Sequence, residues 1–117
     1  YKALDFFQKS LQIQKKFHDI PGMAVSYNNI GLIYDERNEY EKALEFYKKD
    51  LDIAKTLENK NNLATSYNNI GNLHYRHQKY ARSLWYLEKA IEIYKKLENK
   101  KMITNLEERI KDLRSKL

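Results

Sequence analysis

Two histidines are the residues of this chain that most suggest metal chemistry. His74 and His77 stand three positions apart, so on a helix both imidazoles would face one side and could share a zinc ion. No carboxylate or third histidine falls naturally on that face, and His18 lies in a distant segment. Two ligands do not complete a protein zinc site, so we expect no metal.

Catalytic signatures are also missing from the sequence. The chain contains no cysteine, which leaves no thiol nucleophile, disulfide or cysteine-based metal site. It has no glycine-rich phosphate loop, no nucleophile elbow and no pair of carboxylates placed for acid–base work. We therefore expect a protein that is not an enzyme and that carries no cofactor.

Asparagines are the residues that could bind a peptide backbone. Asn28 and Asn68 occupy equivalent places in a repeated segment, and Asn72 follows Asn68 by one helical turn. An amide both donates and accepts, so a row of amides can pair with an extended peptide without fixing its side chains. The alternative is that these asparagines solvate a helix face or bond to an adjacent helix, and the sequence leaves both open.

The segments that carry these asparagines are repeated. Ser-Tyr-Asn-Asn-Ile-Gly occurs at 26–31 and again at 66–71, so the register repeats every 40 residues. The segment Lys-Ala-Leu at 2–4 likewise matches 42–44. Repeated units bury a continuous core by stacking, and such chains usually act through the surface that the units share. The repeat therefore favours binding over catalysis.

Each unit reads as two helices. Apolar residues at spacings of one, three and four predict a first helix that ends near Glu36 and, after a turn at 37–39, a second helix from Tyr40. Asn38 suits the left-handed conformation of a tight helix exit, whereas Gln78 takes it at a conformational cost. Asp19 is placed to cap the first helix, and Pro21 fits its first turn.

Two glycines fall inside the first helices of their units. Gly31 and Gly71 each cost about 1 kcal/mol relative to alanine, so a close helix contact must compensate for them. The second helix supplies large side chains for this contact at 46–47 and 86–87, while Ala43 and Ser83 keep the other half of the crossing small. We expect the helix pairs to cross at these points.

The pattern of one unit resembles the tetratricopeptide repeat. The matching positions are Tyr27, Ile30, Gly31, Tyr34, Tyr40, Ala43 and Tyr47 in one unit, and Tyr67, Ile70, Gly71, His74, Tyr80, Ser83 and Leu87 in the next. The chain departs from the usual period of about 34 residues and lacks the proline near the end of the second helix. Longer units with paired asparagines are similar to those of kinesin light chains and of bacterial peptide-sensing regulators and sensor kinases.

The resemblance implies an all-α superhelix, or solenoid, of antiparallel helix pairs in one array over 1–117. In this scheme 1–18 is the second helix of a truncated repeat, 21–58 and 61–98 are full repeats, and 101–117 is a C-terminal capping helix. Because the pattern starts in the middle of a unit, we expect a fragment. Glu107 and Lys111 replace the tyrosine and glycine types in the last helix, whose apolar spacing could also begin a coiled coil.

The resemblance also implies where a ligand would bind. In this family the first helices line a concave groove, which here gives the peptide-binding candidates Asn28, Leu32, Asp35, Asn68, Asn72, Tyr75 and Arg76. The tyrosines, including Tyr27 and Tyr67, fall on packing positions. The implied function is a scaffold that holds a protein or extended peptide in the groove. The alternative is an oligomerising or sensory segment of a larger signalling protein, self-associating through the array ends, with Trp85 a candidate surface contact.

Charge and hydropathy limit the other partners. The formal net charge is +6, but lysine pairs such as Lys48/Lys49 are interleaved with glutamates along the predicted outer helices. We read this as a solvated face and expect no nucleic-acid binding. No apolar run approaches the roughly 20 residues that span a bilayer, so we expect no membrane association and take the cytoplasm as the default location.

Overall fold

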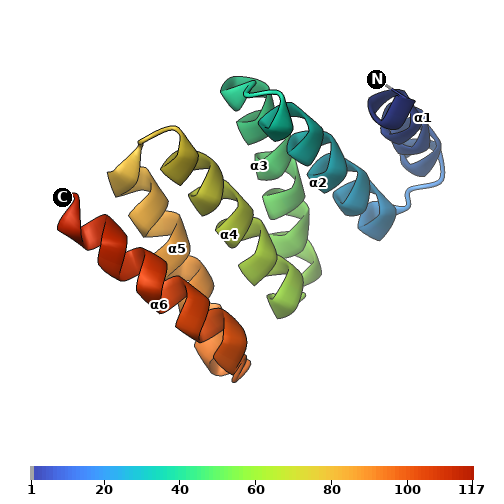
Figure 1. Ribbon diagram of the computed structural model, residues 1–117. Helices are drawn as coiled ribbons and strands as arrows, with labels where there is room; N and C mark the ends of the chain where they lie inside the picture. Colours follow the sequence, from blue (N-terminus) through green and yellow to red (C-terminus); the bar gives the residue numbers. More distant parts are fainter. Residues whose placement is uncertain (1) are drawn as a thin grey trace. The chain divides into compact units, whose positions relative to one another are not determined.

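The computed structural model describes residues 2–117, and all regular secondary structure in this range is helical. The chain divides into two compact units, 1–57 and 58–117. The first unit contains α1 (Lys2–Lys16), α2 (Ile20–Glu36) and α3 (Tyr40–Leu57). The second contains α4 (Lys60–Arg76), α5 (Tyr80–Lys96) and α6 (Lys100–Ser115), and Figure 1 labels each helix. The finer division into a truncated repeat, two full repeats and a cap stays a prediction.

Three of the helices begin with the same side-chain cap. Asp19, Asn59 and Asn99 precede α2, α4 and α6, and each side-chain oxygen accepts a hydrogen bond from the amide nitrogen three residues later, at 3.0, 3.1 and 3.2 Å. Such a cap satisfies one of the amides that a helix start leaves unpaired and stabilises the helix by about 1 kcal/mol. The expected cap at Asp19 is confirmed, and Pro21 lies in the first turn of α2.

The turns between consecutive helices share one backbone feature. Each contains a non-glycine residue with a positive φ of 54 to 60°, at His18, Asn38, Glu58, Gln78 and Glu98. Asn38 and Gln78 adopt the left-handed conformation expected for them. Because this conformation costs L-residues roughly 1 to 2 kcal/mol, packing of the helices on either side must impose it.

The helix pairs approach closely at the two interior glycines. A Cβ atom on Gly31 would lie 2.6 Å from Cδ1 of Tyr47, and one on Gly71 would lie 2.5 Å from Cδ2 of Leu87. Tyr47 and Leu87 are themselves buried. Any side chain at either glycine would therefore displace the residue that fills the crossing, which explains why glycine is used despite its low helix propensity.

The small residues on the opposite helices complete these crossings. Ala43 and Ser83 are fully buried. The Ser83 hydroxyl donates a hydrogen bond of 2.7 Å to the carbonyl oxygen of Gly71, so the α4–α5 crossing includes a buried hydrogen bond from this position. Tyr27 packs beside Phe46 in the first unit, with ring centroids 6.1 Å apart, and Tyr67 lies 6.2 Å from Tyr86 in the second.

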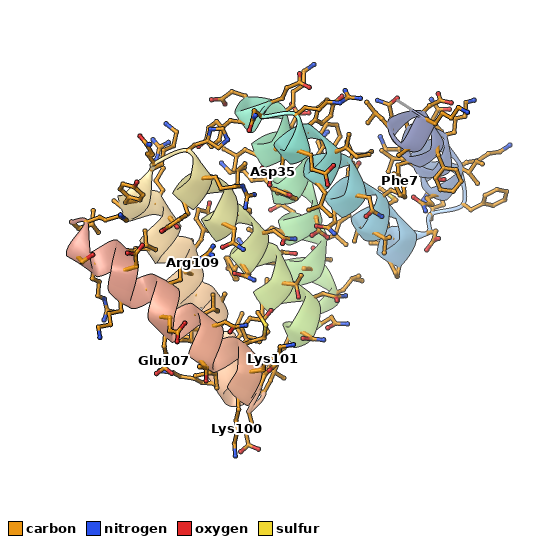
Figure 2. All side chains as sticks on the ribbon, in the orientation of Figure 1. Phe7, Asp35, Lys100, Lys101, Glu107 and Arg109 are labelled. Carbon is orange, nitrogen blue, oxygen red and sulfur yellow. The ribbon has the colours of Figure 1, made fainter. Side chains whose placement is uncertain are left out.

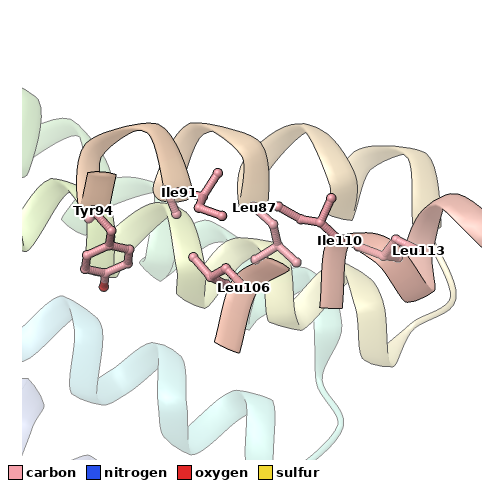
Figure 3. Close-up of a cluster of buried hydrophobic side chains, with 8 residues drawn as sticks. Leu87, Ile91, Tyr94, Leu106, Ile110 and Leu113 are labelled. Carbon is pink, nitrogen blue, oxygen red and sulfur yellow. The ribbon is translucent and has the colours of Figure 1, made fainter. Parts of the chain in front are cut away.

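The core of the second unit continues between α5 and α6 (Figure 3). Leu87, Ile91 and Tyr94 from α5 and Leu106, Ile110 and Leu113 from α6 are buried together, as Figure 3 labels them. The apolar spacing of the last helix, alternating between four and three, thus packs against α5. This packing fixes the rotation of α6 about its own axis, and so decides which α6 side chains face α4.

We predict that Gly31→Leu lowers the free energy of unfolding by about 1 to 3 kcal/mol, because the new side chain overpacks the contact with Tyr47. Thermal or urea unfolding followed by circular dichroism measures the effect. The control is Val25→Leu on the same helix, which is 60% exposed and should change stability by no more than about 0.5 kcal/mol. Equal curves for the two variants would show that the crossing is not closely packed.

Candidate functional site

The second unit contains a polar pocket of about 340 Å³ between α4 and α6. We call it the α4–α6 pocket. It is lined by Asn68, Asn72, Met102, Asn105, Leu106, Glu108 and Arg109. Three of these side chains are amides and one is a guanidinium, so most of the lining can form hydrogen bonds.

Two polar stripes of equal spacing face each other across this pocket. On α4 the stripe is Asn68, Asn72 and Tyr75, which are four and then three residues apart and share one helix face. On α6 the corresponding stripe is formed by Asn105, Arg109 and Asp112. The contacts from 72 to 109 and from 75 to 112 both span 37 residues, because α4 and α6 run in the same direction (Figure 1).

Arg109 is held in place by two α4 side chains. Its Nη1 donates a short hydrogen bond to Oδ1 of Asn72. Its guanidinium carbon lies 4.9 Å from the ring centroid of Tyr75, a cation–π distance. The Nδ2 of Asn72 in turn donates to Oδ1 of Asn68 at 3.4 Å. Figure 2 labels Arg109 on α6, on the side of that helix that faces α4.

The Tyr75 phenol links the two stripes at their C-terminal ends. Its hydroxyl donates a 2.6 Å hydrogen bond to Oδ2 of Asp112. This hydrogen bond is the main cause that raises the pKa of Tyr75 above its usual 10.0, with smaller contributions from desolvation and from the negative charge of Asp112, while Arg109 opposes the rise. The phenol therefore stays protonated and donating throughout the neutral range.

The predicted site residues of α4 are distributed unevenly around the pocket. Asn68 and Asn72 line it, and Tyr75 adjoins it by stacking on Arg109. Arg76 is the exposed last residue of α4 and does not line the pocket. The structure thus brings three of the four together.

The predicted site residues of the first unit lie on α2. Asn28 is partly buried and Leu32 is 38% exposed. Asp35 differs from the exposed groove position expected for it, because it is only 9% exposed and its Oδ2 accepts a 3.1 Å hydrogen bond from the Tyr47 hydroxyl. The cause is the glycine crossing: the ring of Tyr47 lies over Gly31, and its hydroxyl extends one turn further to Asp35.

The α6 half of the pocket was not predicted from the sequence, in which Asn105, Arg109 and Asp112 were assigned no binding role. The α6 stripe has the same spacing of four and then three residues as the α4 stripe. This shared spacing is the sequence signal that could have identified the α6 residues. The contacts join residues 37 apart, whereas the repeat aligns Asn68 with Glu108, 40 residues later.

His74 is buried, with its ring centroid 5.4 Å from that of Tyr86. Within 2–117, no three histidine, cysteine or acidic side chains gather as metal ligands would. In the same range, no helix combines the length and apolar character needed to span a bilayer.

We predict that Asp112→Ala lowers the pKa of Tyr75 toward 10, because it removes the largest cause of the rise. The Cζ chemical shift of Tyr75, followed against pH in carbon-13 tyrosine-labelled protein, measures this. Because the folded-state pKa is raised, the contact stabilises the fold fully below pH 10 and less as the pH rises through the folded value. A Tyr75 titration that is the same in both proteins would contradict the assignment.

Comparisons with known proteins identify the repeat. Two sequence models, both described as tetratricopeptide repeat, match residues 1–56 and 63–101. No curated protein sequence matches the chain. The all-α fold class expected from the sequence is confirmed by these matches and by solved structures.

Three solved structures illustrate the likeness. The apo form of RapI is 30% identical, with a TM-score of 0.82 over 90% of this chain and 38% of RapI. A signal transduction ATPase with numerous domains from Pyrococcus horikoshii, which has a tetratricopeptide repeat sensor, is 26% identical with a TM-score of 0.82. That match covers 91% of this chain and 16% of the ATPase.

The third structure, BtubC from P. vanneervenii, is 21% identical and shares the fold alone, with a TM-score of 0.72 over 97% of this chain and 56% of BtubC. The chain therefore spans 38% of RapI, 16% of the ATPase and 56% of BtubC, less than two thirds of each. Capped helix pairs that cross at interior glycines and the two family matches lead to one conclusion: the chain belongs to the tetratricopeptide-repeat family.

Proposed function

We propose that the chain binds an extended peptide segment of a partner protein along the facing stripes of α4 and α6. Tetratricopeptide repeats are generally protein-interaction modules, typically without catalytic activity. The observation that carries the finer proposal is the α4–α6 pocket, where two asparagines of α4 face an asparagine and an arginine of α6. A peptide backbone offers the carbonyl and amide groups that such side chains bind.

The size and lining of the pocket suit a segment of chain better than a small apolar ligand. Its volume of about 340 Å³ lies at the lower end of the range for small-molecule sites, about 300 to 1,000 Å³. Small-molecule sites are mostly apolar, whereas here Met102 and Leu106 are the only apolar lining residues. The polar stripes also extend beyond the pocket to Tyr75 and Asp112, which gives an elongated surface for a strand-like ligand.

We predict that Asn68→Ala/Asn72→Ala weakens binding to peptides selected from a displayed random-peptide library by about tenfold or more. The reason is that the variant loses pocket hydrogen bonds worth about 0.5 to 1.5 kcal/mol each. Fluorescence anisotropy with the resynthesised peptides measures the dissociation constants.

The matched control for this experiment is Asn62→Ala, an exposed asparagine on α4 outside the pocket. It should bind every selected peptide as tightly as the unmodified protein. Unchanged affinity in the double variant, or equal losses in the double variant and the control, would remove the pocket from the binding surface.

A second candidate function is assembly through a groove on the other side of α6. This α5–α6 groove has a volume of about 800 Å³, and Trp85, which is 53% exposed, lies on its wall. In the first unit, Tyr27, Gly31 and Tyr34 receive α3, but the positions 80 residues later are Glu107, Lys111 and Arg114. A helix with the apolar contact face of α3 does not fit against these charged side chains. A partner of this groove must therefore present a surface different from that of α3.

We predict that, if this groove mediates assembly, Trp85→Ala shifts the protein from dimer to monomer in size-exclusion chromatography with light scattering. Exposed aromatic residues are frequent anchors of interfaces, which is why Trp85 is the residue to remove. The control is Leu97→Ala, which is 41% exposed and outside the groove. A concentration-independent monomer before mutation would eliminate this candidate.

A further inference from the structure

We infer that one end of the second unit binds a single-stranded nucleic acid through its phosphate groups. We call this surface the basic end, and it is formed by Arg76, Lys79, Arg82 and Lys116. None of the four side chains lines the α4–α6 pocket, so this inference goes beyond the proposed peptide binding and does not depend on it. It is carried by the distribution of charge, by a comparison of two equivalent turns, and by the aromatic rings at this end.

The net positive charge of the chain belongs entirely to the second unit. Residues 1–57 contain nine basic and nine acidic side chains, whereas residues 58–117 contain thirteen basic and seven acidic ones. The formal net charge of +6 thus falls on one half of the chain. Such asymmetry is typical of proteins that bind polyanions. The balance of lysine and glutamate from which we expected no nucleic-acid binding therefore describes the first unit and not the second.

The turn between α4 and α5 has the opposite charge to the equivalent turn of the first unit. Residues 75–82 read Tyr-Arg-His-Gln-Lys-Tyr-Ala-Arg, whereas residues 35–42 read Asp-Glu-Arg-Asn-Glu-Tyr-Glu-Lys. Both turns have the same left-handed residue, with a φ of 60° at Asn38 and at Gln78. Folding is therefore compatible with either charge and does not explain why 75–82 carries arginine and lysine but no acidic residue. Binding of an anion at this surface does explain it.

The basic side chains come together because three helices begin or end here. α4 ends at Arg76, α5 begins at Tyr80, and α6, which runs in the same direction as α4, ends at Ser115 (Figure 1). All four side chains of the basic end are exposed. The sequence has no acidic residue in 59–87, and the last two turns of α6 contribute Asp112. Four positive charges thus share this end with one negative charge, which favours an anionic ligand.

Aromatic rings lie among these cations and favour a single strand over a duplex. The Nζ of Lys116 lies 5.5 Å from the ring centroid of Tyr80, and the centroids of Tyr80 and Tyr75 are 5.9 Å apart. Both rings are partly exposed. A single strand can place a base against such a ring and a phosphate beside the neighbouring cation, whereas a duplex keeps its bases inside. Two of the four basic side chains are guanidinium groups, which bind phosphate oxygens in a forked geometry.

We predict that Arg76→Glu/Lys79→Glu weakens binding of a fluorescein-labelled oligothymidylate of about 20 nucleotides by about tenfold or more at about 0.1 M salt. The variant replaces two phosphate contacts with repulsion, and the first unit already carries glutamate at the equivalent positions 36 and 39. Fluorescence anisotropy measures the dissociation constant. For the unmodified protein, the logarithm of the binding constant should fall with the logarithm of the salt concentration with a slope of about −2 to −3, as for three or four neutralised phosphates.

The matched control is Lys100→Glu/Lys101→Glu, which changes the net charge by the same amount at the opposite end of the second unit. Both lysines are exposed, and Figure 2 labels them at the start of α6. A helix of 16 residues is about 24 Å long, which exceeds the screening length of about 10 Å at this salt concentration. The control should therefore change the affinity by less than about threefold. Melting curves followed by circular dichroism show whether each variant is folded.

The alternatives give different results in the same assay. Unchanged affinity in Arg76→Glu/Lys79→Glu, or equal losses in this variant and the control, would overturn the inference, and equal losses would indicate bulk charge. A duplex of the same length that binds as tightly would overturn the assignment to a single strand. A polyglutamate peptide that competes equally would indicate an acidic protein segment as the ligand. Asn68→Ala/Asn72→Ala should bind the oligonucleotide normally, so that failure of this inference and failure of the peptide proposal are distinguishable.

Discussion

The close approach of two helices over bare backbone is the constraint on which the rest of each unit depends. Tyr47 lies on Gly31, and Leu87 lies on Gly71, at distances that leave no room for a Cβ atom. This contact fixes the distance between the paired helices and their rotation about their own axes. The rotation in turn determines that Asn68 and Asn72 face α6. Polar groups of α4 are thus positioned by an apolar contact on a neighbouring face of the same helix.

Local features of the fold could be predicted from the sequence, because short-range chemistry decides them. Asp19 caps the helix that follows it, and Asn38 takes the left-handed turn, since each depends on neighbours within a few residues. The buried state of Asp35 could not be predicted in this way. It depends on Tyr47, whose equivalent in the next unit is Leu87, which has no hydroxyl group. The environment of the Asp35 carboxylate therefore depends on which residue type occupies position 47, 12 residues away.

The α4 half of the candidate pocket could be predicted from the sequence, whereas the α6 half could not. The repeat register identifies Asn68 and Asn72 as positions on a shared face, but it aligns Asn68 with Glu108. In the structure the facing residues are offset by 37 positions and not 40, because neighbouring parallel helices are staggered by about one turn. Arg109 therefore faces Asn72, although the two have no relation in the repeat alignment. The contacts between α4 and α6 follow from the stagger of these two helices, which duplication of the sequence does not encode.

The tight connections between helices have a consequence for how such pockets change. Each connection contains a single left-handed residue beside a capping position, with no slack to absorb an added residue. If one residue were inserted before α6 and the helix backbone kept its place, every side chain of α6 would move on by one helical position. That shift corresponds to a rotation of about 100° around the helix axis. The guanidinium would then move off the asparagine face and a different side chain would take its place. In this architecture the length of a three-residue connector can select the ligand chemistry without any substitution in the pocket itself.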